Sequence, residues 1–130
     1  MAETKTKSVQ ELLSTIQSEL KAPKGQYNAF GKYKYRSCED ILEGVKPILQ
    51  EYGCTIVLSD TIEQIGDRFY VKATATFYDC DTGESVSNTA YARESDDKKG
   101  MDASQITGTA SSYARKYALN GLLLIDDTKD

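Results

Sequence analysis

The segment between Arg68 and Tyr78 constrains the fold more than any other part of this 130-residue chain. Within it, apolar residues recur at every second position, as Phe69, Val71, Ala73, Ala75 and Phe77. Alternation with a period of two is typical of a β-strand with one buried and one solvated face. We therefore expect a strand over residues 68–78 that lies against a core on one side only.

Two further strands are predicted, one on each side of this segment in the sequence. Residues 54–63 are rich in β-branched side chains, and residues 84–93 follow a run of turn-forming residues at 79–83. A turn at residues 65–67 separates the first two strands. The three strands predict an antiparallel meander with one apolar face, which needs another element to cover it.

The stretch from Asp102 to Gly121 predicts the helix that covers this face. Asp102 and Gln105 have the spacing of a capping box, and Gly121 is placed to end the helix in a left-handed conformation. Apolar residues recur between them at helical spacing, as Ile106, Ala110, Tyr113, Ala114 and Tyr117. We expect this face to pack in the core, tyrosines included, in preference to an arrangement in which the tyrosines stack on nucleic-acid bases.

The opposite face of the same helix is small, polar and basic. It contains Ser104, Gly108, Ser111, Ser112 and Arg115, with Lys116 at its margin. No acidic residue lies between Ala103 and Ile125. A surface of this kind allows another backbone to approach the helix closely, and its basic end favours an anionic one.

Two helices are predicted before the sheet. The first, over residues 9–21, begins at a capping-box sequence made by Ser8 and Glu11. The second contains Pro47, where we expect a kink, and ends at Gly53.

The segment between these helices alternates aromatic and basic residues. Its pattern over residues 32–36 is Lys32, Tyr33, Lys34, Tyr35 and Arg36, which predicts a short strand with cations on one face. Two interpretations remain open. The segment is either an edge strand whose lysines are only solvated, or a strand that follows the phosphates of single-stranded nucleic acid.

Together these elements predict an α+β fold. Its core is an antiparallel three-stranded β-meander covered by a C-terminal helix, with two helices and a short basic strand before it. The length fits a single domain over residues 1–130, and we expect residues 1–7 and 126–130 to be flexible.

The composition argues against several classes of function. The chain has no histidine, no Walker-type Gly-Lys-Ser/Thr loop and no dinucleotide-binding glycine pattern. Neighbouring acids in residues 94–98 point in different directions, so a metal-dependent nuclease is disfavoured. We expect no catalysis, no cofactor and no metal. Three widely spaced cysteines, a polar N-terminus and the lack of a long apolar run predict a cytoplasmic protein with no membrane contact.

The net charge of −4 is unevenly distributed. Between Leu20 and Cys38 there are five basic residues and no acid, whereas acids gather at 39–43, 79–84, 94–97 and 126–130. This separation permits a cationic surface on an acidic protein.

Two motifs resemble the phage Erf family of essential-recombination-function proteins. They are Ala-Phe-Gly-Lys-Tyr-Lys-Tyr-Arg-Ser at 29–37 and Thr-Gly-Thr-Ala-Ser-Ser-Tyr-Ala-Arg-Lys-Tyr-Ala-Leu at 107–119, and the resemblance covers nearly the whole chain. It implies a fold similar to that of the eukaryotic Rad-type annealing proteins, with a β-β-β-α core. It also implies ATP-independent binding and annealing of single-stranded DNA in homologous recombination, through an annealed duplex intermediate, in the cytoplasm of a bacterial host. The implied assembly is a homo-oligomer, either a ring or a helical filament.

The resemblance also implies which residues bind DNA. Basic positions of the family's last helix line a cationic groove and match Arg115 and Lys116. The loop before that helix would contribute Lys98 and Lys99, and the early basic strand would contribute Lys32, Lys34 and Arg36 on the opposite side of the groove. The alternative is a non-catalytic protein-interaction module that docks through its first helix.

Overall fold

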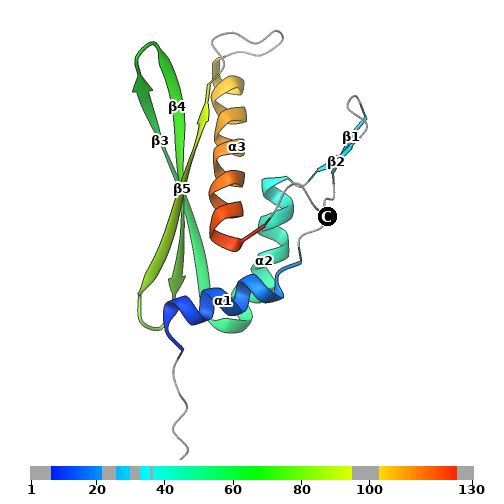
Figure 1. Ribbon diagram of the computed structural model, residues 1–130, viewed down its shortest axis with the longest axis vertical. Coiled ribbons are helices and arrows are strands. Elements are labelled where there is room, and N and C mark those ends of the chain that lie inside the picture. Colours follow the sequence, from blue (N-terminus) through cyan, green and yellow to red (C-terminus); the bar gives the residue numbers. More distant parts are fainter. Residues whose placement is uncertain (1–6, 22–25, 30–32, 36, 95–102, 126–130) are drawn as a thin grey trace, which may run out of the picture.

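The computed structural model describes residues 7–21, 26–29, 33–35, 37–94 and 103–125. In chain order the elements are α1 (Val9–Glu19), β1 (Gln26–Asn28), β2 (Tyr33–Tyr35), α2 (Cys38–Tyr52), β3 (Cys54–Ile65), β4 (Arg68–Asp79), β5 (Ser85–Arg93) and α3 (Ala103–Leu123). The strands β3, β4 and β5 form an open antiparallel sheet in that order, and α3 packs on one face of it (Figure 1). The predicted α+β fold is confirmed.

The alternation in β4 separates the two faces of the sheet. Val71, Ala73, Ala75 and Phe77 are completely buried on the face under α3. On the opposite, outer face the threonines, tyrosines and Lys72 of β4 are only partly buried, and within the described residues no helix packs there. The expected one-sided strand is therefore correct.

The contact between α3 and the sheet is made largely of alanines. The buried side of α3 includes Ala110, Ala114 and Ala118, and α3 packs against β4 and β5. The inner face of those two strands has alanines at positions 73, 75, 90 and 92. Small side chains on both surfaces let the helix backbone lie close to the strands.

The two tyrosines of α3 are not part of this contact, and here the sequence-based prediction is wrong. Tyr113 is 51% exposed and Tyr117 is 46% exposed. A layer built from alanines leaves no room for phenol rings between helix and sheet. The rings therefore lie beside the contact, and leucines 119, 122 and 123 fill the core near the end of α3.

Both N-terminal helices complete the core. The predicted capping box of α1 is present: the Ser8 hydroxyl accepts from the Glu11 N–H at 3.1 Å, and the Glu11 carboxylate accepts from the Ser8 N–H at 2.9 Å. Helix α1 ends at Glu19, two residues before the predicted position. Helix α2 runs through Pro47 as one helix, and Gly53 caps it with a φ of 67°.

The short strand expected at residues 32–36 is present as β2, and it has a partner strand that was not expected. Strands β1 and β2 pair antiparallel with each other, with Tyr27 opposite Lys34. They form a separate two-stranded sheet away from the main one (Figure 1). The segment is therefore not an edge strand of the meander.

Gly121 does not end α3, contrary to the prediction. The helix continues to Leu123, and the left-handed residue is Leu124, with a φ of 57°. A Cβ atom on Gly121 would lie 2.4 Å from the Asn88 Nδ2 atom. That same amide donates to the Ala118 carbonyl at 3.0 Å. Gly121 is therefore needed for the close approach of α3 to β5. The predicted capping box at Asp102 lies outside the described residues.

Among the described residues no helix is long and apolar enough to cross a membrane. The three cysteines are free thiols: Cys54 is buried, Cys38 is half-buried and Cys80 is exposed.

Two glycines of α3 provide a matched test of this packing. Gly121→Ala should lower the free energy of unfolding by about 1 kcal/mol, because the displaced Asn88 amide loses its hydrogen bond and this outweighs the gain in helix propensity. Gly108→Ala should raise it by up to about 1 kcal/mol, since no atom lies within 4 Å of the added Cβ. Urea unfolding measures both. A stabilised Gly121→Ala variant would contradict the proposed role of this glycine.

Candidate nucleic-acid interface

The structure describes the side chains of two of the seven predicted DNA-binding residues. Arg115 and Lys116 lie on α3, and both side chains are partly buried. Lys34 lies in β2, where the structure describes the backbone only. The other four, Lys32, Arg36, Lys98 and Lys99, lie outside the described residues.

Arg115 is held by an acid that the sequence analysis did not identify. Its Nε atom donates to both carboxylate oxygens of Asp60 at 3.1 Å, and its Nη2 atom lies 3.0 Å from Asp60 Oδ2. The Ser111 hydroxyl donates to the same carboxylate at 2.5 Å. These contacts join α3 to β3.

The same contacts determine the ionisation of the pair. Partial burial disfavours the charged form of Asp60, but hydrogen bonds from Arg115 and Ser111 and the charge of Arg115 outweigh this effect, and the pKa of the carboxyl lies below its ordinary value. The hydrogen bond to Asp60 raises the pKa of Arg115. Both groups are therefore charged at neutral pH. The side chain of Arg115 is 41% exposed.

Asp60 could have been recognised from its position in the strand. In β3, Ile56, Leu58 and Asp60 pair with Phe77, Ala75 and Ala73 of β4, which are all buried. Asp60 therefore occupies an inward position, and an acid at such a position requires a cationic or hydrogen-bonding partner. The strand pattern therefore predicts that Asp60 has a polar partner, but it does not predict that the partner is Arg115 of α3.

The start of α2 lies near the two basic residues of α3, Arg115 and Lys116. Burial raises the pKa of the Cys38 thiol, the charges of Arg115 and Lys116 oppose this rise, and Asp60 adds to it. Cys38 is the first residue of α2, and β2 ends three positions earlier at Tyr35. The basic N-terminal segment therefore leads into α2 close to Arg115 and Lys116.

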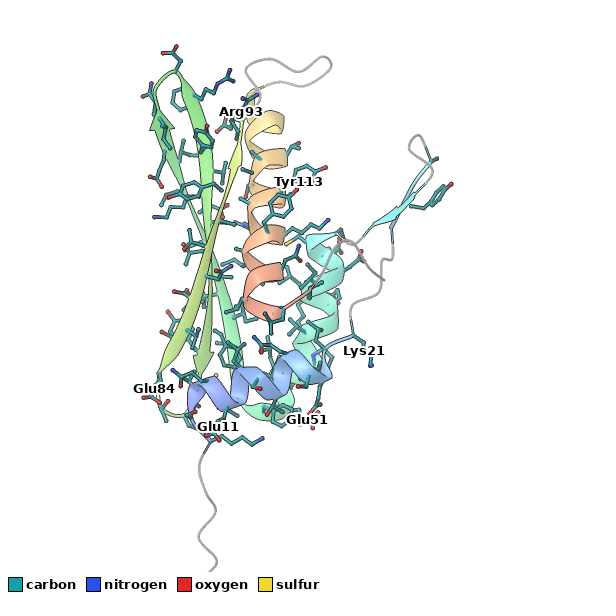
Figure 2. All side chains as sticks on the ribbon, in the orientation of Figure 1. Glu11, Lys21, Glu51, Glu84, Arg93 and Tyr113 are labelled. Carbon is teal, nitrogen blue, oxygen red and sulfur yellow. The ribbon has the colours of Figure 1, made fainter. Side chains whose placement is uncertain are left out.

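The two tyrosines form an exposed aromatic pair on α3. The ring centroids of Tyr113 and Tyr117 are 6.2 Å apart, with 26° between the ring planes. Figure 2 shows Tyr113 projecting from α3 away from the sheet. The interface thus includes aromatic rings as well as cations.

Metal binding has no support among the residues that the structure describes. No group of three or more potential ligand side chains occurs there. The acidic run at 94–98 lies outside them except for Glu94.

The chain was compared with known protein families. The model of the ERF superfamily matches residues 9–130. The chain belongs to the ERF superfamily. The chain is also similar to the "Essential recombination function protein" of Salmonella phage P22, with 64% identity over 118 residues. The alignment covers 91% of this ERF-superfamily chain and 56% of the phage P22 protein, so the chain spans about half the length of that relative. No solved structure matches the chain.

The Asp60–Arg115 pair should stabilise the fold in a pH-dependent way. Asp60→Asn should lower the free energy of unfolding at pH 7 by about 1–2 kcal/mol, because the Arg115 guanidinium loses its anionic partner. A carboxyl whose pKa is lower in the folded state stabilises the protein above its unfolded pKa, and this contribution is lost as pH falls through the folded pKa. The difference between wild type and variant should therefore shrink below about pH 4.

Glu63→Gln on the same strand is the matched control. Glu63 pairs with Lys72 at 3.8 Å on the outer face, and both side chains are 38% exposed. Loss of this ion pair should lower the free energy of unfolding by less than about 0.5 kcal/mol. Urea unfolding at several pH values gives both quantities. Equal losses for the two variants would show that Asp60 makes no special contribution.

Proposed function

We propose that this chain acts in homologous recombination as an ATP-independent protein that binds single-stranded DNA and anneals complementary strands. The observation that carries the proposal is its membership of the ERF superfamily, together with 64% identity to a protein named for an essential recombination function. The protein works without a cofactor and catalyses no bond cleavage. It acts in the cytoplasm of a bacterial host.

The chemistry of annealing fits the surface of α3. A strand can test a complement only if the protein holds its phosphates and leaves the pairing edges of its bases exposed. Lysine and arginine provide such sequence-independent contacts to phosphate. Helix α3 contains Arg115 and Lys116 and no acid within Ala103–Leu123. The proposed DNA contacts are these two residues together with Lys32, Lys34, Arg36, Lys98 and Lys99.

Arg115 can contact phosphate while it is paired with Asp60. A guanidinium has five N–H donors, and the contacts to Asp60 involve the Nε and Nη2 atoms. Asp60 then acts as a positioning residue that fixes the orientation of the guanidinium. Because Arg115 also joins α3 to β3, its replacement tests stability and binding together.

A homo-oligomer is part of the proposal. One domain of this size contacts only a few nucleotides, so several copies are needed for a continuous path along a strand. Head-to-tail contacts between copies produce a ring when they close and a helical filament when they do not.

The alternative of a protein-interaction module that docks through α1 has lost its main support. Val9, Leu13 and Ile16, the apolar side of α1, are buried within the chain. The Gln17 side chain also donates to the Leu122 carbonyl at 2.8 Å. A partner would meet mainly the polar side of α1.

Annealing of two complementary oligonucleotides, followed by fluorescence, tests the proposal directly. The protein should accelerate duplex formation without ATP or Mg²⁺. Its affinity for a single strand should fall steeply with salt, because binding releases counterions. Lys116→Ala should reduce the slope of log affinity against log salt by about 0.7, the value for one phosphate contact on a single strand.

Lys46→Ala is the matched control for this measurement. Lys46 is a lysine of α2 whose ammonium lies 2.6 Å from Glu43, and its removal should leave the slope unchanged. If the wild type neither binds single strands nor accelerates annealing, the proposed function is wrong. If the two lysine variants lose the same slope, α3 is not the site of contact.

A further inference from the structure

The stacked tyrosines of α3 are an exposed aromatic surface that the core does not use. Tyr113 and Tyr117 each leave about half of their surface in contact with solvent although they lie beside a close-packed helix–sheet contact. Their rings stack on each other, which limits the motion of both side chains before any ligand binds. A preorganised pair of this kind loses little entropy when a further flat group stacks on it.

Helical geometry places a cation next to this pair. Tyr113 and Tyr117 are four residues apart and Lys116 is three residues after Tyr113, so the three side chains lie on neighbouring parts of one helix surface. Arg115 lies on the opposite side of α3, because two residues correspond to about 200° of rotation. Arg115 and Ser111 point to Asp60, and the tyrosines point away from it.

A second exposed aromatic surface, on the outer face of the sheet, is less suited to an anionic ligand. Tyr91, on the outer face of the sheet, is 47% exposed. The ammonium of Lys72 lies 6.0 Å from its ring centroid, but the carboxylate of Glu63 is 3.8 Å from the same ammonium. An acid is thus already present on that face, whereas α3 contains none in the described helix.

We propose that Tyr113 and Tyr117 form a stacking site for the bases of single-stranded nucleic acid, with Lys116 beside it to contact the adjoining phosphate. This inference rests on the proposed function and adds a base contact to it. Stacking on aromatic rings is independent of sequence because every base has a π-face. It also leaves the pairing edge of the base accessible, which annealing requires. The bases then lie against the Tyr113–Tyr117 side of α3. Lys116 lies between these tyrosines and Arg115 around the helix, so the backbone of the strand runs on the Lys116 side, and Arg115 is about 100° further around.

Two probes of equal length separate stacking from phosphate contact. One is a thymidine oligonucleotide, and the other is the same sugar–phosphate chain without bases. The wild type should bind the thymidine strand more tightly than the abasic strand. Tyr113→Ala with Tyr117→Ala should weaken binding to the thymidine strand by about tenfold or more and leave binding to the abasic strand unchanged. Fluorescence anisotropy across a salt series gives both affinities and both slopes.

Matched variants separate the contribution of the aromatic rings from that of the Lys116 charge. Tyr113→Phe with Tyr117→Phe keeps the rings and should bind both probes like the wild type. Lys116→Ala should reduce the salt slope for both probes, whereas the double alanine variant should keep the wild-type slope. Far-ultraviolet circular dichroism and thermal unfolding should show that the double alanine variant remains folded, because both rings are half exposed. If it does not fold, the single variants Tyr113→Ala and Tyr117→Ala replace it.

The binding results distinguish failure of the stacking site from failure of the proposed function. A wild type that binds neither probe overturns the proposed function, and the stacking site with it. A wild type that binds the thymidine strand while the double alanine variant binds it equally well overturns only the stacking site. An equal loss on both probes, together with a change in oligomer size by light scattering, also overturns it and places the tyrosines at a contact between copies.

Discussion

The close contact between α3 and the sheet is the constraint on which the rest of the structure depends. Alanines 110, 114 and 118 of the helix are buried over strands that also carry alanines. The short distance that results excludes rings from the contact, and it requires Gly121 where α3 passes Asn88. The exposure of the two tyrosines and the need for a glycine at position 121 thus both follow from the close packing of α3 on the sheet.

Hydrogen bonds fix the position of α3 along the sheet, which a layer of alanines does not do by itself. Methyl groups interdigitate poorly, so they resist sliding of a helix along a sheet less than large side chains do. Hydrogen bonds join α3 to the sheet at two points of the described structure: the Asn88 amide on the Ala118 carbonyl, and Asp60 with Arg115 and Ser111. One of these points lies next to the proposed DNA-binding residues. The same arginine therefore belongs both to the framework and to the proposed surface.

Local patterns predicted most of the fold, because they are complete within a few residues. The period-two segment of β4, the capping box of Ser8 and Glu11 and the left-handed Gly53 each required no knowledge of distant parts. On α3, the burial of Ala110 and Ala114 was predicted correctly and that of the tyrosines wrongly. Tyrosines and alanines both recur at helical spacing, and only the space under the helix decides between them. Gly121 was misjudged because a glycine can serve either a turn or a close approach. At the site, the sequence placed Arg115 and Lys116 on one helix, but Asp60 lies in a different element and its pairing depends on the fold.

The alanine layer also has a consequence for the entropy of folding. A buried leucine or methionine gives up rotamers when it enters a core, whereas alanine has none to lose. The alanine positions of α3 therefore enter the core with no loss of side-chain entropy, and the main cost at these positions is that of fixing the backbone. Most of the side-chain freedom of α3 stays in the residues that face solvent. The stacked tyrosines are the exception there, because their contact already limits the motion of both rings before anything binds.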